Sequence, residues 1–414
     1  MSSGNGPAPL CLAVGMVLSL ILPVVVKRRL GHLRYTEELS YWGTKRIYSR
    51  GNDFKYTPSQ RAATASVETA VTANYGYEIP DLPNGKLGAL GEGVIIYVIE
   101  SEVCFDPNYL DIPKTRYSYL PNVEPDTFSH LAQNRKGWAD IHGTLVANMA
   151  AGVQFGAAPQ ATLVAVYRDP SKAKGLKAAL ELIKTHYDAQ TSKPPAIINM
   201  SFGQVQAANP EKLLGFNPLK EFLDCDELIC ELTDKRGILL VAAAGNEKVE
   251  VSSETRDAVD KYLLKSTNEK DKEAILAFLQ AKQVVLPASH PKVLSVGGHD
   301  EKDDCTQFYH GSGVDIYAPG FYVPYFTTPN NVWRNCPTYI SAHSPLNQIR
   351  TLVDTRKPAA TPLVAGSIAR RMSERQQQGM PRQSPEWWIG LVKAEARVKI
   401  KENYLLHCCA PRGG

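Results

Sequence analysis

Three polar residues stand where their side chains could take part in acyl-transfer chemistry. His142 lies in the run DIHGTLVA, directly before a helical segment, and Gly143 lets the backbone turn so that the imidazole stays exposed. Asn246 ends the run LLVAAAGN, where a carboxamide can donate a hydrogen bond to a developing oxyanion. Glu100 is an acid at the end of the apolar run GVIIYVIE. Taken alone, each residue also has a structural explanation as a helix start, a turn residue or a strand end.

The segments that position these residues alternate between short apolar runs and helical stretches. Six runs rich in Val and Ile indicate buried strands at 93–100, 161–168, 196–203, 237–246, 292–298 and 314–320. Helical segments are expected at 142–152, about 173–188, about 211–235 and 358–373. This alternation predicts an α/β fold with a doubly wound, mainly parallel sheet, and its ligand site at the carboxyl ends of the strands.

Six short motifs occur in an order that resembles the subtilisin-like serine proteases over roughly residues 91–372. They are HGT, NMSFG, AAGN, PASHPKVLSVGG, DIYAPG and ATPLVAG. The resemblance implies a three-layer subtilisin-like fold. It also implies that Glu100, His142 and Asn246 occupy the positions of the triad acid, the triad base and the oxyanion donor. The strand that lines the pocket for the substrate side chain matches Asn199, Met200, Ser201, Phe202 and Gly203.

The position of the serine nucleophile in that family is held here by Pro358. The family motif Gly-Thr-Ser-x-Ala-x-Pro falls on RKPAATP, so Arg356, Lys357 and Pro358 replace three consecutive residues. The matches that follow, ATPLVAG, leave no freedom to shift the alignment by one position. Proline has no hydroxyl to attack a carbonyl and no backbone N–H for an oxyanion hole. It does suit the first turn of a helix.

The acid position departs from the family as well. Glu100 replaces the usual Asp, and Glu102 replaces a glycine. Ser341, Ser344 and Thr355 are candidate replacement hydroxyls upstream of Pro358, and Thr355 would need a backbone rearrangement to reach the site. The sequence therefore predicts a catalytically inactive pseudoprotease that binds peptide or acts as a scaffold. The alternative is a serine-type endopeptidase with an atypical triad.

Composition and charge limit the other classes of partner. Lys and Arg total 46 against 42 for Asp and Glu, and the basic residues are scattered, so no nucleic-acid partner is predicted. Members of the resembled family often bind calcium, but no dense Asp/Asn loop assigns a site, and no other cofactor is expected. None of the eight cysteines is in a CxxC pair, so no zinc site is predicted. Bridges Cys225–Cys230 and Cys305–Cys336 remain alternatives to free buried thiols.

The chain divides into four parts by composition. Residues 1–29 contain the apolar run 7–26, which is long enough to span a bilayer and is followed by KRR. We expect a membrane anchor formed by this single helix, with a signal peptide of a secreted protein or a misplaced translation start as alternatives. A linker or remnant region at 30–90 follows. The peptidase-like domain at 91–372 carries a charged helical insertion at 247–283, and 373–414 form a C-terminal tail.

Overall fold

The computed structural model describes residues 89–101, 103, 110, 112–120, 142–153, 156–168, 175–205, 225–245, 250, 252–263, 270, 274, 277, 285–299, 305, 310–320, 360–395, 398–400 and 403–405. The predicted anchor at 7–26 and nearly all of the predicted linker at 30–90 lie outside these residues. Within the described part of the chain, no helix is both long enough and apolar enough to cross a bilayer.

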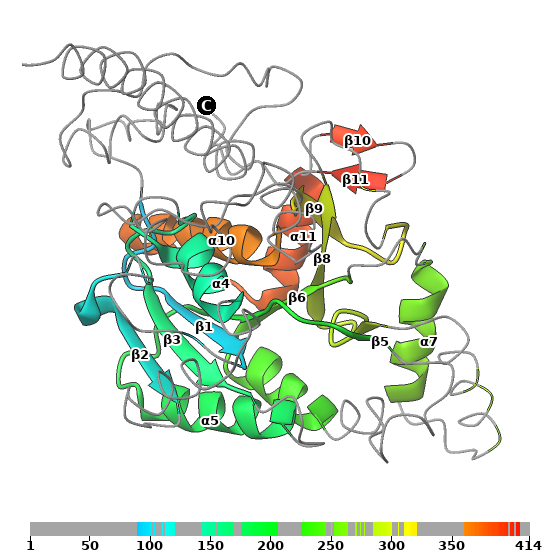
Figure 1. Ribbon diagram of the computed structural model, residues 1–414, viewed down its shortest axis with the longest axis horizontal. Helices are drawn as coiled ribbons and strands as arrows, with labels where there is room; N and C mark the ends of the chain where they lie inside the picture. Colours follow the sequence, from blue (N-terminus) through cyan, green and yellow to red (C-terminus); the bar gives the residue numbers. More distant parts are fainter. Residues whose placement is uncertain are drawn as a thin grey trace, which may run out of the picture.

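A seven-stranded parallel sheet forms the centre of the fold (Figure 1). Its strands lie in the order β2-β3-β1-β4-β6-β8-β9, and every adjacent pair is parallel. β2 and β3 lie on one side of β1, and the later strands β4, β6, β8 and β9 lie on its other side. This change of direction at β1 is the arrangement expected of a doubly wound sheet. The strands are β1 (Ile95–Glu100), β2 (Tyr117–Leu120), β3 (Thr162–Tyr167), β4 (Ala196–Met200), β6 (Leu239–Ala243), β8 (Val293–His299) and β9 (Ile316–Pro319).

The six strands predicted from apolar runs are confirmed. β1, β4, β6 and β8 are buried along their whole length. Such runs are apolar at every position because helices cover both faces of the sheet. The sequence does not predict the seventh strand, β2, which follows the short 3-10 helix η2 (Lys114–Arg116). β2 is a four-residue edge strand whose residues are mostly half-buried, so it lacks the continuous apolar signal.

Helices form the two outer layers (Figure 1). α4 (His142–Ala151), α10 (Ala360–Gln377) and α11 (Pro385–Glu395) lie on one face. On the other face lie α5 (Gly175–Ala189) and the helical segment 225–230, which continues into the π-helix η5 (Glu231–Lys235). Successive residues of β1 point into different layers, because side chains alternate along a strand. Ile96 and Val98 belong to the α4–α10 core, whereas Tyr97 and Ile99 belong to the α5 core.

Two short antiparallel pairs lie outside the main sheet. β5 (Gln204–Val205) pairs with β7 (Val285–Leu286), and β10 (Val398–Ile400) pairs with β11 (Asn403–Leu405). β5 directly follows residues 199–203, the segment predicted to contact substrate, so the first pair lies beside that segment.

The domain continues past the predicted boundary at residue 372. α10 runs on to Gln377, and α11 lies within the predicted tail 373–414. Trp388 and Val392 of α11 are almost fully buried and belong to the same core as α4 and α10. The predicted boundary was placed too early, because the family motifs end before α11 although α11 still contributes core side chains.

The charged insertion predicted at 247–283 is anchored to the domain through its described helix, α7 (Ser253–Leu263). Arg256 on this helix donates hydrogen bonds from Nη2 to the carbonyls of His290 (3.1 Å) and Val293 (2.9 Å). Its Nη1 pairs with Asp315, which directly precedes β9, at 2.5 Å. The insertion is therefore more than a solvated surface helix.

Asp315 is a buried carboxylate held by two cations from different helices. Its side chain is 3% exposed, and Lys393 of α11 contacts its second oxygen at 2.9 Å. Burial alone would raise the pKa of Asp315, but the charges of Arg256 and Lys393 and the hydrogen bonds from Arg256 and the Ser295 N–H outweigh burial and lower the pKa. Asp315 therefore links α7, β8 and α11 in its charged form.

We expect Asp315→Asn to lower the free energy of unfolding at pH 7 by about 3 kcal/mol, because the half-buried Arg256 loses its carboxylate partner. The folded-state pKa of Asp315 lies below the unfolded value. The stabilisation is therefore present above about pH 4 and is lost as the pH falls through the folded pKa. Urea unfolding of the wild type and the variant should show a difference that shrinks from pH 7 towards pH 3.

The exposed Lys261 of α7 supplies the control, since Lys261→Gln removes a charge from the same helix without touching Asp315. That variant should unfold like the wild type. Equal unfolding free energies for Asp315→Asn and wild type at pH 7 would contradict a stabilising role for the buried ion pairs.

Candidate functional site

The predicted site lies at the carboxyl edge of the sheet, where β1, β4 and β6 end. Because these strands are parallel neighbours, their last residues meet at one edge. α4 begins at His142, and α10 packs against α4, β1 and β4. The structure thus brings Glu100, the start of α4 and the end of β4 into one region, at the edge where doubly wound sheets generally bind ligands.

Glu100 is the last residue of β1 and is 5% exposed. Its carbonyl accepts a hydrogen bond from the backbone N–H of Arg168 at 2.9 Å. The guanidinium of Arg168 lies over the ring of Phe202, 4.3 Å from its centroid. Arg168 thereby connects the predicted acid position, through its backbone N–H, to the predicted substrate segment, through its side chain.

The other predicted catalytic positions are less completely described. The backbone of His142 begins α4, but its side chain lies outside the described side chains. Asn246 and Pro358 also lie outside the described residues, just beyond β6 and just before α10. The structure places α4, β6 and α10, and the roles of the three residues stay predictions from the sequence.

The predicted substrate segment is only partly accessible. Asn199 and Met200 are fully buried and pair with β6 inside the sheet. Ser201 is also buried, and its hydroxyl accepts a hydrogen bond from Asn199 Nδ2 at 2.9 Å. Phe202 is half-buried and Gly203 is exposed. A ligand at this edge can reach the last two residues, while the first three hold the strand in place.

A valine from another part of the chain occupies the space beside Gly203. A Cβ atom on Gly203 would lie 2.4 Å from Val285 Cγ1 and 3.4 Å from the carbonyl oxygen of Ala243. The close approach arises because β7 pairs with β5, which directly follows Gly203. Glycine is needed here for the absence of a side chain, and Val285 limits what else fits against this segment.

Sequence reasoning missed Arg168 and Val285. Arg168 ends the apolar run ATLVAVYR, so the strand-end rule that singled out Glu100 would have found it. Val285 carries no comparable signal, because its position depends on pairing between segments that are far apart in the sequence.

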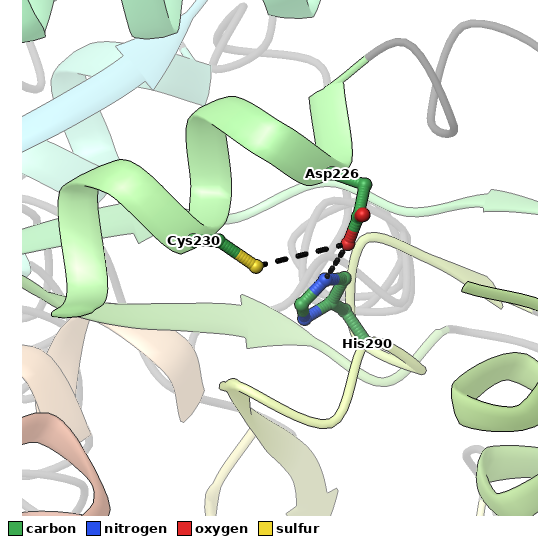
Figure 2. A group of neighbouring side chains, drawn as sticks. All are labelled: Asp226, Cys230 and His290. Atoms are coloured by element: carbon green, nitrogen blue, oxygen red, sulfur yellow. Dashed lines mark hydrogen bonds and ion pairs between the residues drawn. The ribbon is translucent and has the colours of Figure 1, made fainter. Parts of the chain in front are cut away.

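A second cluster of polar side chains lies on the face of the sheet that α5 covers, and it comprises Asp226, Cys230 and His290 (Figure 2). Their potential ligand atoms lie within 4.8 Å of one another. Asp226 and Cys230 are four residues apart in a helical segment, which places them on one face of it. His290 comes from the turn before β8. The distances are 3.0 Å from His290 Nε2 to Asp226 Oδ1 and 3.9 Å from Cys230 Sγ to the same oxygen.

The hydrogen bonds of His290 favour a structural role over a metal site. The backbone N–H of Lys292 donates to Nδ1 at 3.0 Å, so the neutral ring carries its proton on Nε2 and donates it to Asp226. A metal ion at Nε2 would need that lone pair and would force a proton onto Nδ1, against the Lys292 N–H. The cluster therefore links the helical segment to the turn.

The protonation states agree with this role. Burial lowers the pKa of His290 despite the neighbouring Asp226 carboxylate, which favours the neutral ring. Burial and Asp226 raise the pKa of the Cys230 thiol, which disfavours the reactive thiolate. Cys225 and Cys230 are both free thiols, so the disulfide considered between them is not formed.

A family model described as the subtilase family matches residues 91–399. Among curated proteins, subtilisin-like protease 3 of Pseudogymnoascus destructans is 25% identical over 235 residues, which is 56% of this chain and 44% of that protein. The chain thus spans less than half the length of this relative.

The chain is also similar to solved structures. The epidermin leader peptide processing serine protease of Staphylococcus aureus superposes with a TM-score of 0.50 at 20% identity, covering 85% of this chain and 82% of that one. A cold adapted subtilisin-like serine proteinase has a TM-score of 0.48 at 18% identity, with coverage of 89% and 98%. At 20% identity, the similarity to the epidermin leader peptide processing protease establishes the fold alone.

We expect Gly203→Ala to lower the free energy of unfolding by about 1–3 kcal/mol, because the new methyl group collides with Val285. Val285→Ala should relieve the collision, so the double variant should lose less stability than the sum of the single variants. Guanidinium unfolding of the four proteins measures this coupling. Additive effects would show that Val285 does not confine Gly203.

Proposed function

Because the chain belongs to the subtilase family, we propose that it is a catalytically inactive member, a pseudoprotease that captures an extended peptide without cleaving it. The observation that carries the proposal is Pro358 at the position of the nucleophilic serine, two residues before α10 begins at Ala360. Proline supplies neither a nucleophilic hydroxyl nor a backbone N–H for the oxyanion. Both main contributions of that residue to proteolysis are therefore missing.

The acid position supports the same conclusion. Glu100 keeps a carboxyl group at the end of β1, but its side chain is one methylene longer than the Asp of the family and is buried. Catalytic groups need placement within about 0.5 Å of productive geometry, so the longer side chain is a handicap to the orientation of His142. Departures at both the acid and the nucleophile positions fit a site that is no longer used for catalysis better than they fit an active one.

Peptide capture needs no nucleophile. An extended peptide can pair its main chain with an exposed strand segment, which supplies affinity through backbone hydrogen bonds. Within the described residues, Phe202 and Gly203 make no backbone hydrogen bond and lie at the carboxyl edge of the sheet. Val285 fills the space beside Gly203, so we expect the peptide to carry glycine or alanine at the position that faces it. If no peptide binds, the remaining form of the proposal is that the inactive domain acts as a scaffold.

The second candidate function is a serine-type endopeptidase that recruits another hydroxyl, with Thr355 three residues before Pro358 in the sequence. The intact motifs around His142 and Asn246 favour it, because a base and an oxyanion donor are still encoded. Active-site labelling separates the two functions, since only a competent nucleophile reacts.

We expect a fluorophosphonate probe to leave the purified chain unlabelled under conditions that label an active subtilase completely. Loss of the serine in this class of enzyme lowers kcat by about 10⁶, and loss of an oxyanion donor lowers it further by about 10²-fold or more. Peptide hydrolysis should likewise stay at the level of the buffer blank. The matched control is His142→Ala: labelling of the native chain that disappears in this variant would establish the endopeptidase instead.

We expect isothermal titration calorimetry to detect binding of extended peptides that contain glycine or alanine. Peptides of the same sequence with N-methyl groups on alternate backbone nitrogens should bind at least about tenfold more weakly, because they lose main-chain donors. Val285→Gly should extend binding to peptides with larger side chains at the matching position. Equal heats for native and methylated peptides would rule out pairing with the main chain.

A further inference from the structure

A pocket of about 510 Å³ opens at the amino ends of the strands, on the opposite edge of the sheet from Glu100. Ile95 and Thr162, the first residues of β1 and β3, contribute to its wall together with Gly237, just before β6. The end of α10 and the connection to α11 complete it. Since β1 has six residues, about 17 Å of strand separates this pocket from the candidate site. Its volume suits a small organic ligand.

The pocket is cationic. Lys193, Arg375 and Arg382 line it, and none of the described lining residues is acidic. Asp188 is nearby in sequence, but Arg236 already holds it through two hydrogen bonds of 2.8 and 2.7 Å. The three positive charges therefore have no carboxylate of their own among the lining residues.

Two of these cations also have a structural task. Arg382 donates to Tyr187 Oη (2.6 Å) and to the carbonyls of Lys193 (3.1 Å), Arg236 (2.8 Å) and Gly237 (2.8 Å). Lys193 donates to the carbonyl of Tyr187 at 3.1 Å, near the end of α5. Carbonyls at helix ends attract cations, which accounts for both positions. These acceptors are uncharged, so they leave the net positive charge in place.

Arg375 has no such explanation. Its Nε is buried and makes no hydrogen bond within the described part of the chain. Its guanidinium lies 4.8 Å from the ring centroid of Trp387. Nε itself cannot be reached from the pocket, but the Nη atoms also make no hydrogen bond within the described residues and are not buried, so they can donate to an acceptor in the pocket.

Apolar side chains are exposed at the same place. Met380, 44% exposed, lines the pocket, and Trp387, 37% exposed, lies under Arg375. Among the described residues, no other large hydrophobic side chain is exposed. Trp388 and Met372 form an apolar wall inside the pocket. An apolar wall and an exposed apolar rim beside positive charges suit a ligand that is partly apolar and partly anionic.

We propose that this pocket binds a small organic anion with an apolar or aromatic body. Arg375 receives the anionic group through charge-assisted hydrogen bonds from its guanidinium. Arg382, whose Nη atoms already donate to Tyr187 Oη and three carbonyls, contributes its positive charge. The apolar body lies against Met380 and Trp388. The site is separate from the carboxyl edge, and its occupancy does not depend on whether the chain cleaves or binds peptides.

The test uses two fluorescent probes with the same aromatic body, anilinonaphthalene sulfonate and uncharged phenylnaphthylamine. Fluorescence titration of the full-length chain should show that the sulfonate binds on the order of tenfold more tightly. Met380→Glu places a negative charge at the pocket rim and should weaken sulfonate binding by a similar factor. Met380→Gln is its uncharged match and should stay within about twofold of the native affinity, because position 380 is exposed and the fold does not depend on it.

Arg375→Gln should also weaken the sulfonate and leave the uncharged probe unchanged, whereas Lys261→Gln on α7 should affect neither. Circular dichroism of each variant confirms folding, and the Met380 pair decides the outcome if Arg375→Gln is unfolded. Equal binding of the two probes, or equal sulfonate affinity in Met380→Glu and Met380→Gln, would overturn the proposal.

Discussion

Burial of a parallel sheet on both faces is the constraint on which the remaining structure depends. A strand such as β1 has no solvent-facing side, so Ile96 and Val98 must fill one core while Tyr97 and Ile99 fill the other. Backbone groups inside these layers can be satisfied only by neighbouring strands, which keeps the strands in register. Polar chemistry is consequently pushed to the two edges of the sheet. Glu100 lies at the carboxyl edge, and the cationic pocket lies at the amino edge.

The same constraint explains what could be predicted from sequence. Strands buried on both faces leave continuous apolar runs, so β1, β4 and β6 were predictable, and the acid at the end of β1 was visible as a break in such a run. Features that join distant segments left no local signal. Val285 approaches Gly203 only because β7 pairs with β5. Likewise, nothing near Arg375 in the sequence indicates that the start of β1 and the end of α10 enclose a pocket.

Packing and catalysis make separable demands on the motif ATPLVAG at the start of α10. A Cβ atom on Gly366 would lie 2.6 Å from the carbonyl oxygen of Ala150 and 2.7 Å from Ala157 Cβ, so the contact between α10 and α4 requires glycine. Ala360, Val364 and Ala365 are buried in the same core. These requirements hold whether or not the preceding residue is a nucleophile. The motif can therefore persist in a chain whose residue 358 is proline.

Arg256 makes the charged insertion part of the packing of the domain, unlike a loop that is only appended to the surface. It reaches from α7 to Asp315, which Lys393 of α11 also contacts. An insertion that merely decorated the surface could be shortened or lost with little effect on the domain. Here its removal would take one of two counter-charges from a buried carboxylate, and Lys393, whose side chain is 50% exposed, would remain as a weaker partner. Once such a carboxylate is buried, the insertion and the core can change in evolution only together.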